Sequence, residues 1–116
     1  MDIETLREIC LSFPHATEDV KWGKDLCFCI GQKLFCVCGL DAGDGWQFSF
    51  KCTPEKFAEL VEIEGIIPAP YVARYHWVAV QDPNVLDSDD IEDLITKSYM
   101  LVLENLPQET RNSLGK

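Results

Sequence analysis

Apolar residues recur at helical spacing at both ends of the chain and alternate with polar residues in the middle. Positions 3, 6, 9, 10 and 13 are apolar and Pro14 follows them, which predicts an amphipathic helix over residues 3–13 with one face on a sheet. A polar turn is expected at residues 15–19. Strand-like sequence then begins at Val20 and includes Trp22.

Residues 27–38, CFCIGQKLFCVC, alternate around a central glycine and predict a β-hairpin with a two-residue turn at Gly31 and Gln32. In that register, residues whose numbers sum to 63 face each other. Side-chain alternation then puts all four cysteines on one face and the larger apolar residues on the other, core face. The expected cross-strand pairs are Cys27 with Cys36 and Cys29 with Leu34, and the expected core residues are Phe28, Ile30, Phe35 and Val37.

Further elements follow in the second half of the chain. Residues 46–51 alternate large and polar side chains as a half-buried strand does, with Trp46, Phe48 and Phe50 on one face. Thr53 begins a helix, with a proline in its first turn and Gly65 as its expected stop.

Two prolines predict an extended loop or irregular edge over residues 66–75, and residues 76–80 form the last strand. Acidic residues at 87–90 favour a helix N-terminus there, and a last helical turn is possible after Pro107. The expected buried face of this helix comprises Ile91, Leu94, Ile95, Ser98 and Val102.

The order of elements is therefore helix, three or four antiparallel strands, helix, one or two strands, helix. This order predicts an α+β two-layer sandwich in which the helices cover one face of an antiparallel sheet. The 116 residues are enough for one core, so residues 1–116 are expected to form a single domain.

Composition and charge limit the classes of function that the chain can have. No apolar run is long enough to span a membrane and no secretory leader is recognisable, so we expect a cytoplasmic protein with reduced thiols. The formal net charge of -10 opposes a broad, charge-driven affinity for nucleic acid or anionic lipid. The acidic run at residues 82–93 lacks the ligand spacing of a calcium loop and is read as a solvated helix start.

Six cysteines and two histidines are the candidate reactive or metal-binding groups. Four thiols on one sheet face could bind zinc, but C-x-C within a strand separates the sulfurs by about 7 Å, so small apolar packing is the preferred interpretation. A Cys27–Cys36 disulfide would be strained. A Cys52–His76 nucleophile pair has no supporting local signature, and no phosphate loop, dinucleotide fingerprint or H-E-x-x-H occurs. We therefore expect no metal, no cofactor and no catalytic residues.

Several short segments in order resemble the MmcQ/YjbR family over nearly the whole chain. They are residues 13–23 (FPHATEDVKWG), 28–35 (FCIGQKLF), Phe50-Lys51, 68–71 (PAPY), Trp77-Val78, Ser98-Tyr99 and Leu106-Pro107. The resemblance implies a fold like that of CyaY (frataxin) and type III secretion chaperones, and DNA binding through a "double wing" of hairpins. It supplies no catalytic residue or cofactor.

The chain departs from the family pattern at positions 29 and 36–38, which are commonly arginine, alanine or other apolar residues and here contain Cys29, Cys36 and Cys38, and at 108–111, where paired lysines are often found. Both changes remove positive charge.

Two functions remain open at this point. In the first, the protein binds DNA weakly and without catalysis, using the hairpin tip and the loop before Trp46 as wings. Trp77 is then expected to pack in the sheet rather than to stack on bases. In the second, a protein-interaction or chaperone-like module holds a partner on the exposed sheet face or at the Pro68-Ala-Pro-Tyr71 edge, without nucleic acid. The candidate nucleic-acid contacts are Lys21, Trp22, Lys33, Lys51 and Arg74.

Overall fold

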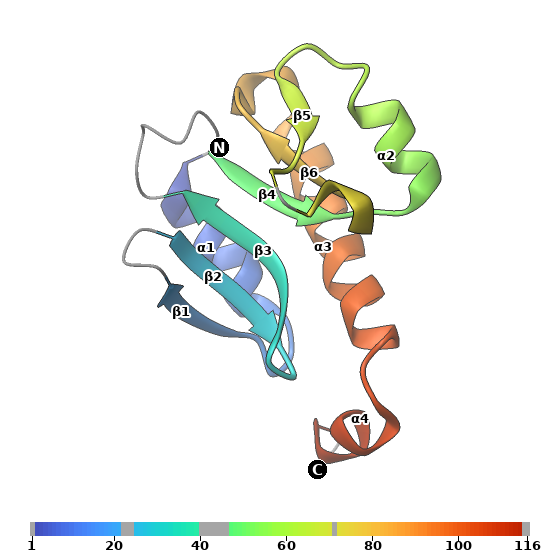
Figure 1. Ribbon diagram of the computed structural model, residues 1–116. Coiled ribbons are helices and arrows are strands. Elements are labelled where there is room, and N and C mark those ends of the chain that lie inside the picture. The colour runs from blue at the N-terminus through green and yellow to red at the C-terminus, as the bar shows by residue number, and fades with distance from the viewer. Residues whose placement is uncertain (1, 22–24, 40–46, 71, 115–116) are drawn as a thin grey trace.

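The computed structural model describes residues 2–21, 25–39, 47–70 and 72–114, so Trp22, Trp46 and Tyr71 of the predictions above lie outside it. Figure 1 shows a curved sheet with helices behind and beside it. The elements are α1 (Ile3–Ser12), β1 (Thr17–Lys21), β2 (Asp25–Ile30), β3 (Lys33–Gly39), β4 (Phe48–Lys51), α2 (Pro54–Leu60), β5 (Ile66–Pro68), η2 (Ala73–Tyr75), β6 (Trp77–Val80), η3 (Pro83–Val85), α3 (Ser88–Glu104) and α4 (Gln108–Leu114).

The helices begin where side-chain caps satisfy their first amide groups. The Asp2 carboxylate accepts a hydrogen bond from the Thr5 amide at 2.8 Å, and the Thr53 hydroxyl accepts one from the Lys56 amide at 3.2 Å. The α2 start predicted at Thr53 is therefore confirmed. All five residues expected on the inner face of α3 are buried, as predicted.

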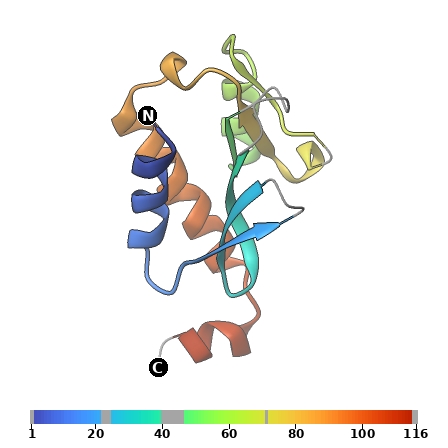
Figure 2. The same ribbon diagram turned by 90° about the vertical axis from the view of Figure 1, so that its left-hand side faces the viewer.

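The six strands form one antiparallel sheet in the order β1-β2-β3-β4-β6-β5, which confirms the predicted α+β class. Figure 2 shows α1 and α3 on one side of this sheet, while α2 packs against β5 and β6. The polar turn expected at residues 15–19 is wrong in part, because β1 already begins at Thr17. An edge strand with both faces exposed has no need of apolar residues, so its pattern resembles that of a turn.

The β2–β3 hairpin has the predicted two-residue turn, with positive φ at both Gly31 and Gln32, but its register shifts by one residue beyond it. Cys29 faces Leu34 as expected. Phe28 then faces Cys36, so that Phe35 is an extra residue in β3, a β-bulge. The predicted Cys27–Cys36 pair is therefore wrong, since Cys27 faces Val37 instead.

The bulge distributes the four hairpin cysteines between the two faces of the sheet. Cys36 and Cys38 join the core beneath the helices, together with Phe28, Ile30 and Phe35. Cys27 and Val37 lie in a second cluster on the other face, and Cys29 projects there by alternation. The expectation that four cysteines share one face, with Val37 opposite, is wrong because alternation alone does not predict a bulge.

Strands β3 and β4 separate at this bulge, and a hydroxyl group from α3 fills the seam between them. The last pair between the strands is Cys36 with Phe50. Beyond it, the fully buried Ser98 hydroxyl donates to the Phe35 carbonyl at 2.6 Å and accepts from the Lys51 amide at 3.0 Å. Ser98 thus satisfies two backbone groups that the sheet leaves unpaired.

The hairpin turn packs against the C-terminal part of the chain. A Cβ atom at Gly31 would lie 2.8 Å from a Leu106 methyl carbon and 2.9 Å from the methyl carbon of Thr110. The last turn of helix expected after Pro107 is present as α4, to which Thr110 belongs. The turn of this hairpin is therefore covered on one side.

Candidate functional site

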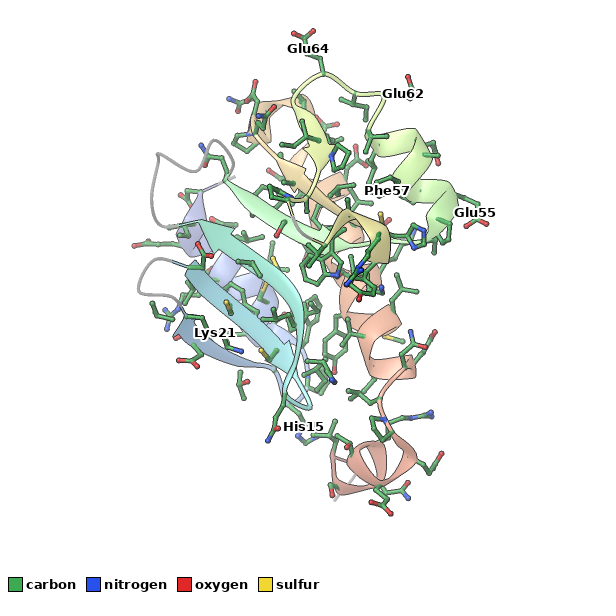
Figure 3. All side chains as sticks on the ribbon, in the orientation of Figure 1. His15, Lys21, Glu55, Phe57, Glu62 and Glu64 are labelled. Carbon is green, nitrogen blue, oxygen red and sulfur yellow. The ribbon has the colours of Figure 1, made fainter. Side chains whose placement is uncertain are left out.

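The residues predicted to contact nucleic acid are spread over the fold. Lys21 ends the edge strand β1 (Figure 3), the exposed Lys33 begins β3 beside the hairpin turn, Lys51 ends β4, and Arg74 belongs to η2. Trp22 lies outside the described residues. The structure therefore shows no single basic stripe that includes all the described members of the set.

Strand register also divides these lysines between the two faces of the sheet. Lys51 pairs with Trp77, whose side chain lies on the face away from α1 and α3. Lys21 projects to that same face by alternation. Lys33 pairs instead with Ile30, which belongs to the core beneath the helices. Cross-strand partners point to the same side, so Lys33 belongs to the other face.

Lys51 and Arg74 do come together, around the exposed residue Tyr75. The Lys51 ammonium donates to the Tyr75 carbonyl at 2.7 Å, and the Arg74 guanidinium carbon lies 4.8 Å from the centroid of the Tyr75 ring, a cation–π contact. Half of the Tyr75 surface is exposed. We call these three residues the basic aromatic cluster.

The turn that carries this cluster is anchored to the start of α2. His76 has a left-handed backbone, with φ 65°, and closes η2 by donating its amide to the Ala73 carbonyl at 2.9 Å. The His76 carbonyl accepts from the Cys52 amide at 2.9 Å, and its ring lies edge-on against Phe57 at 5.8 Å. These contacts hold Tyr75 and Arg74 in place beside Lys51.

The same contacts decide the role of Cys52 and His76. The Cys52 thiol donates to the backbone carbonyl of His76 at 3.3 Å, not to its imidazole, and burial raises the pKa of Cys52 to about 11. A thiol with such a pKa is almost entirely protonated at neutral pH. The pair considered in the sequence therefore acts as a structural hydrogen bond.

Burial also favours the neutral form of the thiols of Cys27, Cys29 and Cys36. All six cysteines are free and buried. Burial raises the pKa of Cys27 to about 11, and burial raises the pKa of Cys36 well above its ordinary value. Within the described ranges, no three histidine, cysteine or acidic side chains are arranged to hold a metal ion. The bulge is one cause, because it places the hairpin thiols on both sides of the sheet.

The sheet face away from α1 and α3 is closed rather than exposed along its centre. Cys27, Val37 and Ala79 are buried there, and Trp77 keeps only 8% of its surface exposed, in agreement with its expected packing role. Ala69 belongs to this cluster and donates its amide to the Trp77 carbonyl at 3.0 Å. The centre of this face is therefore buried, while Thr17 and Asp19 on β1 remain exposed, and the hypothesis of a partner on the sheet face stays a prediction.

Acidic groups and a groove lie on and beside α2. Figure 3 shows Glu55 on α2, and Glu62 and Glu64 beyond its end, directed outward. A groove of about 220 Å³ lies between the start of α2 and α3, with Met100 exposed on its rim. Tyr75 and this groove are not predicted from the sequence, although an aromatic residue next to Arg74 is a signal for the first. The groove is lined by Cys52, Thr53, Lys56, Leu94, Lys97, Met100, Leu101 and Glu104.

An antiparallel sheet with helices packed on one face and buried free thiols defines a small α+β domain. Within the described residues, no helix has the length and apolar character needed to cross a membrane. The YjbR family model matches residues 11–101, so the chain belongs to the YjbR family.

Solved structures agree with this assignment. The Deinococcus radiodurans protein DR2400, described as a DUF419 domain, is 25% identical to this chain with a TM-score of 0.85. The matched region covers 97% of this chain and 87% of the DR2400 chain. A Pseudomonas syringae protein solved by the Northeast Structural Genomics Consortium shares the fold, with a TM-score of 0.71 at 20% identity. The matched region covers 87% of this chain and 98% of the Pseudomonas chain. A search of curated proteins gives no match. The likeness to CyaY and secretion chaperones stays a prediction.

Proposed function

We propose that this YjbR-family protein is a non-enzymatic nucleic-acid-binding protein of the cytoplasm that binds single-stranded segments through its basic aromatic cluster. The observation that carries the proposal is the position of two cations on one exposed aromatic residue, Lys51 at the Tyr75 carbonyl and Arg74 over the Tyr75 ring. Base stacking on an aromatic ring with nearby cations for the phosphates is the usual mode of single-strand binding.

The cluster suits this role because its parts are already ordered. The η2 turn is closed by its own hydrogen bond and tied to Cys52, so little conformational entropy remains to be lost when a base stacks on Tyr75. Arg74 lies over the Tyr75 ring and Lys51 at the Tyr75 carbonyl, so two cations are near a base that stacks on the exposed part of the ring.

The same geometry predicts weak binding. Two phosphate contacts give a salt dependence of log Kobs with a slope of about -1.4 for a single strand, and stacking of one base adds about 1–3 kcal/mol. The formal net charge of -10 and the glutamates near α2 oppose the approach of a polyanion. Binding is therefore expected at low ionic strength and is lost as salt rises.

The thiols support a non-enzymatic role in a reducing compartment. Burial raises the pKa values of Cys27 and Cys52 to about 11, which leaves little thiolate for nucleophilic chemistry at neutral pH. Free cysteines, as in all six positions here, are typical of proteins of the cytoplasm.

The test is fluorescence anisotropy with labelled single-stranded and duplex DNA at low and moderate salt. Arg74→Glu and Tyr75→Ala should each weaken single-strand binding by about tenfold or more, since the first replaces one of the two phosphate contacts by a repulsive charge and the second removes the stacking ring. Arg111→Glu on α4 is the matched control, because it changes the net charge as Arg74→Glu does but lies on a different element.

Equal losses in Arg74→Glu and Arg111→Glu would show that only net charge matters and would refute the cluster. Absence of binding by the unmodified protein at low salt would end the nucleic-acid proposal and leave a protein partner as the remaining hypothesis.

A further inference from the structure

Three of the five large hydrophobic side chains that are exposed in the described part of the chain lie on α1 and β1. They are Ile3 at 40%, Leu11 at 36% and Val20 at 53% exposure. Ile3 and Leu11 are four residues before and after Arg7. The side chains of Ile3, Arg7 and Leu11 therefore share one stripe of α1. Figure 2, which views the molecule from its β1 side, shows this helix and strand in front.

An ion pair fixes the position of this stripe over β1. The Arg7 guanidinium donates two hydrogen bonds of 2.6 Å to the Glu18 carboxylate, so the Arg7 side of α1 is directed to the edge strand. Val20 lies two residues beyond Glu18 and therefore points to the same side of the sheet. We call Ile3, Leu11, Val20 and the outer edge of β1 the β1 edge surface.

β1 is the first strand of the sheet order and pairs only with β2 among the described strands, which leaves its outer backbone edge open. An open edge is a template for another strand. We propose that a second copy of this chain occupies the β1 edge surface, with the two β1 strands antiparallel about a two-fold axis through Val20.

The charges of β1 select this register. Two copies related by a two-fold axis perpendicular to the sheet pair residues whose numbers sum to an even value, so one residue faces its own copy. Centring on Glu18, Asp19 or Lys21 places two like charges opposite each other, which is destabilising. Centring on Val20 places Val20 against Val20 and Asp19 against Lys21 on both sides of the axis.

The two kinds of contact then lie on opposite faces of the joined sheet. Asp19 and Lys21 project away from the helices and form two reciprocal ion pairs. Val20 projects toward the face of the sheet that carries α1, where its exposed side chain would meet Val20 of the second copy. Charged residues on an edge ordinarily prevent pairing, and here they disfavour the registers centred on Glu18, Asp19 and Lys21. A register centred on Thr17 opposes β1 to residues 13–17, of which only Thr17 belongs to the strand, so the register centred on Val20 is favoured.

The first test is the mass of the unmodified protein by sedimentation equilibrium over a range of concentrations. The expected result is a reversible increase from the chain mass of 13.2 kDa to twice that value. Asp19→Lys, which places lysine against Lys21, should raise the dimer dissociation constant at least tenfold without changing the circular dichroism spectrum. A mass of one chain at the highest soluble concentration would overturn the proposal.

The second test fixes the register by oxidative cross-linking of a single exposed cysteine. Directly paired Cα atoms in antiparallel strands are about 4.5–5.5 Å apart, within disulfide range, so Val20→Cys should form a covalent dimer rapidly. Glu18→Cys is the control on the same strand and face, because its copies would be offset by four residues, about 13 Å. Cross-linking of Glu18→Cys as fast as Val20→Cys would refute the register.

Discussion

Removal of the Ser98 hydroxyl is the sharpest test of how the sheet is held together. Ser98 is fully buried on α3, and its hydroxyl bridges the Phe35 carbonyl and the Lys51 amide across the seam between β3 and β4. Ser98→Ala keeps the helix and deletes only this bridge. Both backbone groups then lose their partner in a place where the strands are too far apart to pair directly.

The expected loss follows from the burial of the two groups. An unsatisfied buried backbone group costs about 1–3 kcal/mol. The Phe35 carbonyl lies in the core and takes the full penalty, while the half-buried Lys51 position allows water to replace part of its bond. We expect Ser98→Ala to lower the free energy of unfolding by about 2–3 kcal/mol. With about 2.1 cal/mol/K of unfolding entropy per residue, this corresponds to a fall in Tm of roughly 8–12 °C.

Urea unfolding followed by tryptophan fluorescence measures this loss directly, because Trp77 is buried in the sheet. Thr96→Ala is the matched control on the same helix, where the hydroxyl donates to the Glu92 carbonyl at 2.8 Å in an exposed setting. The control should change stability by less than about 0.5 kcal/mol. If Ser98→Ala costs no more than this control, the strands close on each other without the hydroxyl and the reasoning is wrong.

Three further predictions concern single side chains. Gln32→Gly should raise the free energy of unfolding by about 0.5–1 kcal/mol in urea titrations, because Gln32 holds a left-handed backbone at φ 69°; a loss would show that its side chain contributes more than the strain costs. Tyr99→Phe should lower stability by about 1 kcal/mol through loss of the 2.7 Å bond to the Pro14 carbonyl, and an unchanged urea midpoint would contradict that bond. Burial raises the pKa values of Cys27 and Cys52 to about 11, so between pH 9 and 11 the folded state retains thiol protons that the unfolded chain releases. The free energy of unfolding should therefore fall as pH rises from about 9 to 11, and less steeply in Cys52→Ala. A stability that does not change over this pH range would refute this prediction.

The sequence predicted the helices and the class of fold because their signals are local. Thr53 caps α2 and the inner face of α3 repeats at helical spacing, so neither depends on distant residues. The hairpin faces were predicted wrongly because the bulge at Phe35 depends on Ser98, which is 63 residues away in the chain. No alternation pattern contains that information.

The candidate site shows the same limit. Lys51 and Arg74 were named for their charge, but their meeting around Tyr75 depends on the anchoring of η2 by Cys52 and His76. The packing of Ala69 on the sheet face away from α1 and α3 could likewise not be predicted, because the sequence of a proline-rich segment does not indicate the surface on which it packs. The charges of Lys51 and Arg74 could be read from the sequence, whereas long-range packing decided that these two side chains lie together.

The cover over the hairpin turn has a consequence for the newly made chain. Gly31 is packed against Leu106 and Thr110, which are synthesised after all of α3. A ribosome-bound chain can form this local hairpin early, but Cys36 and Cys38 then lack the α3 side chains that bury them in the finished core. Burial of these thiols therefore has to wait for the synthesis of α3, and the contact that covers the hairpin turn forms only after Leu106 and Thr110 have been added.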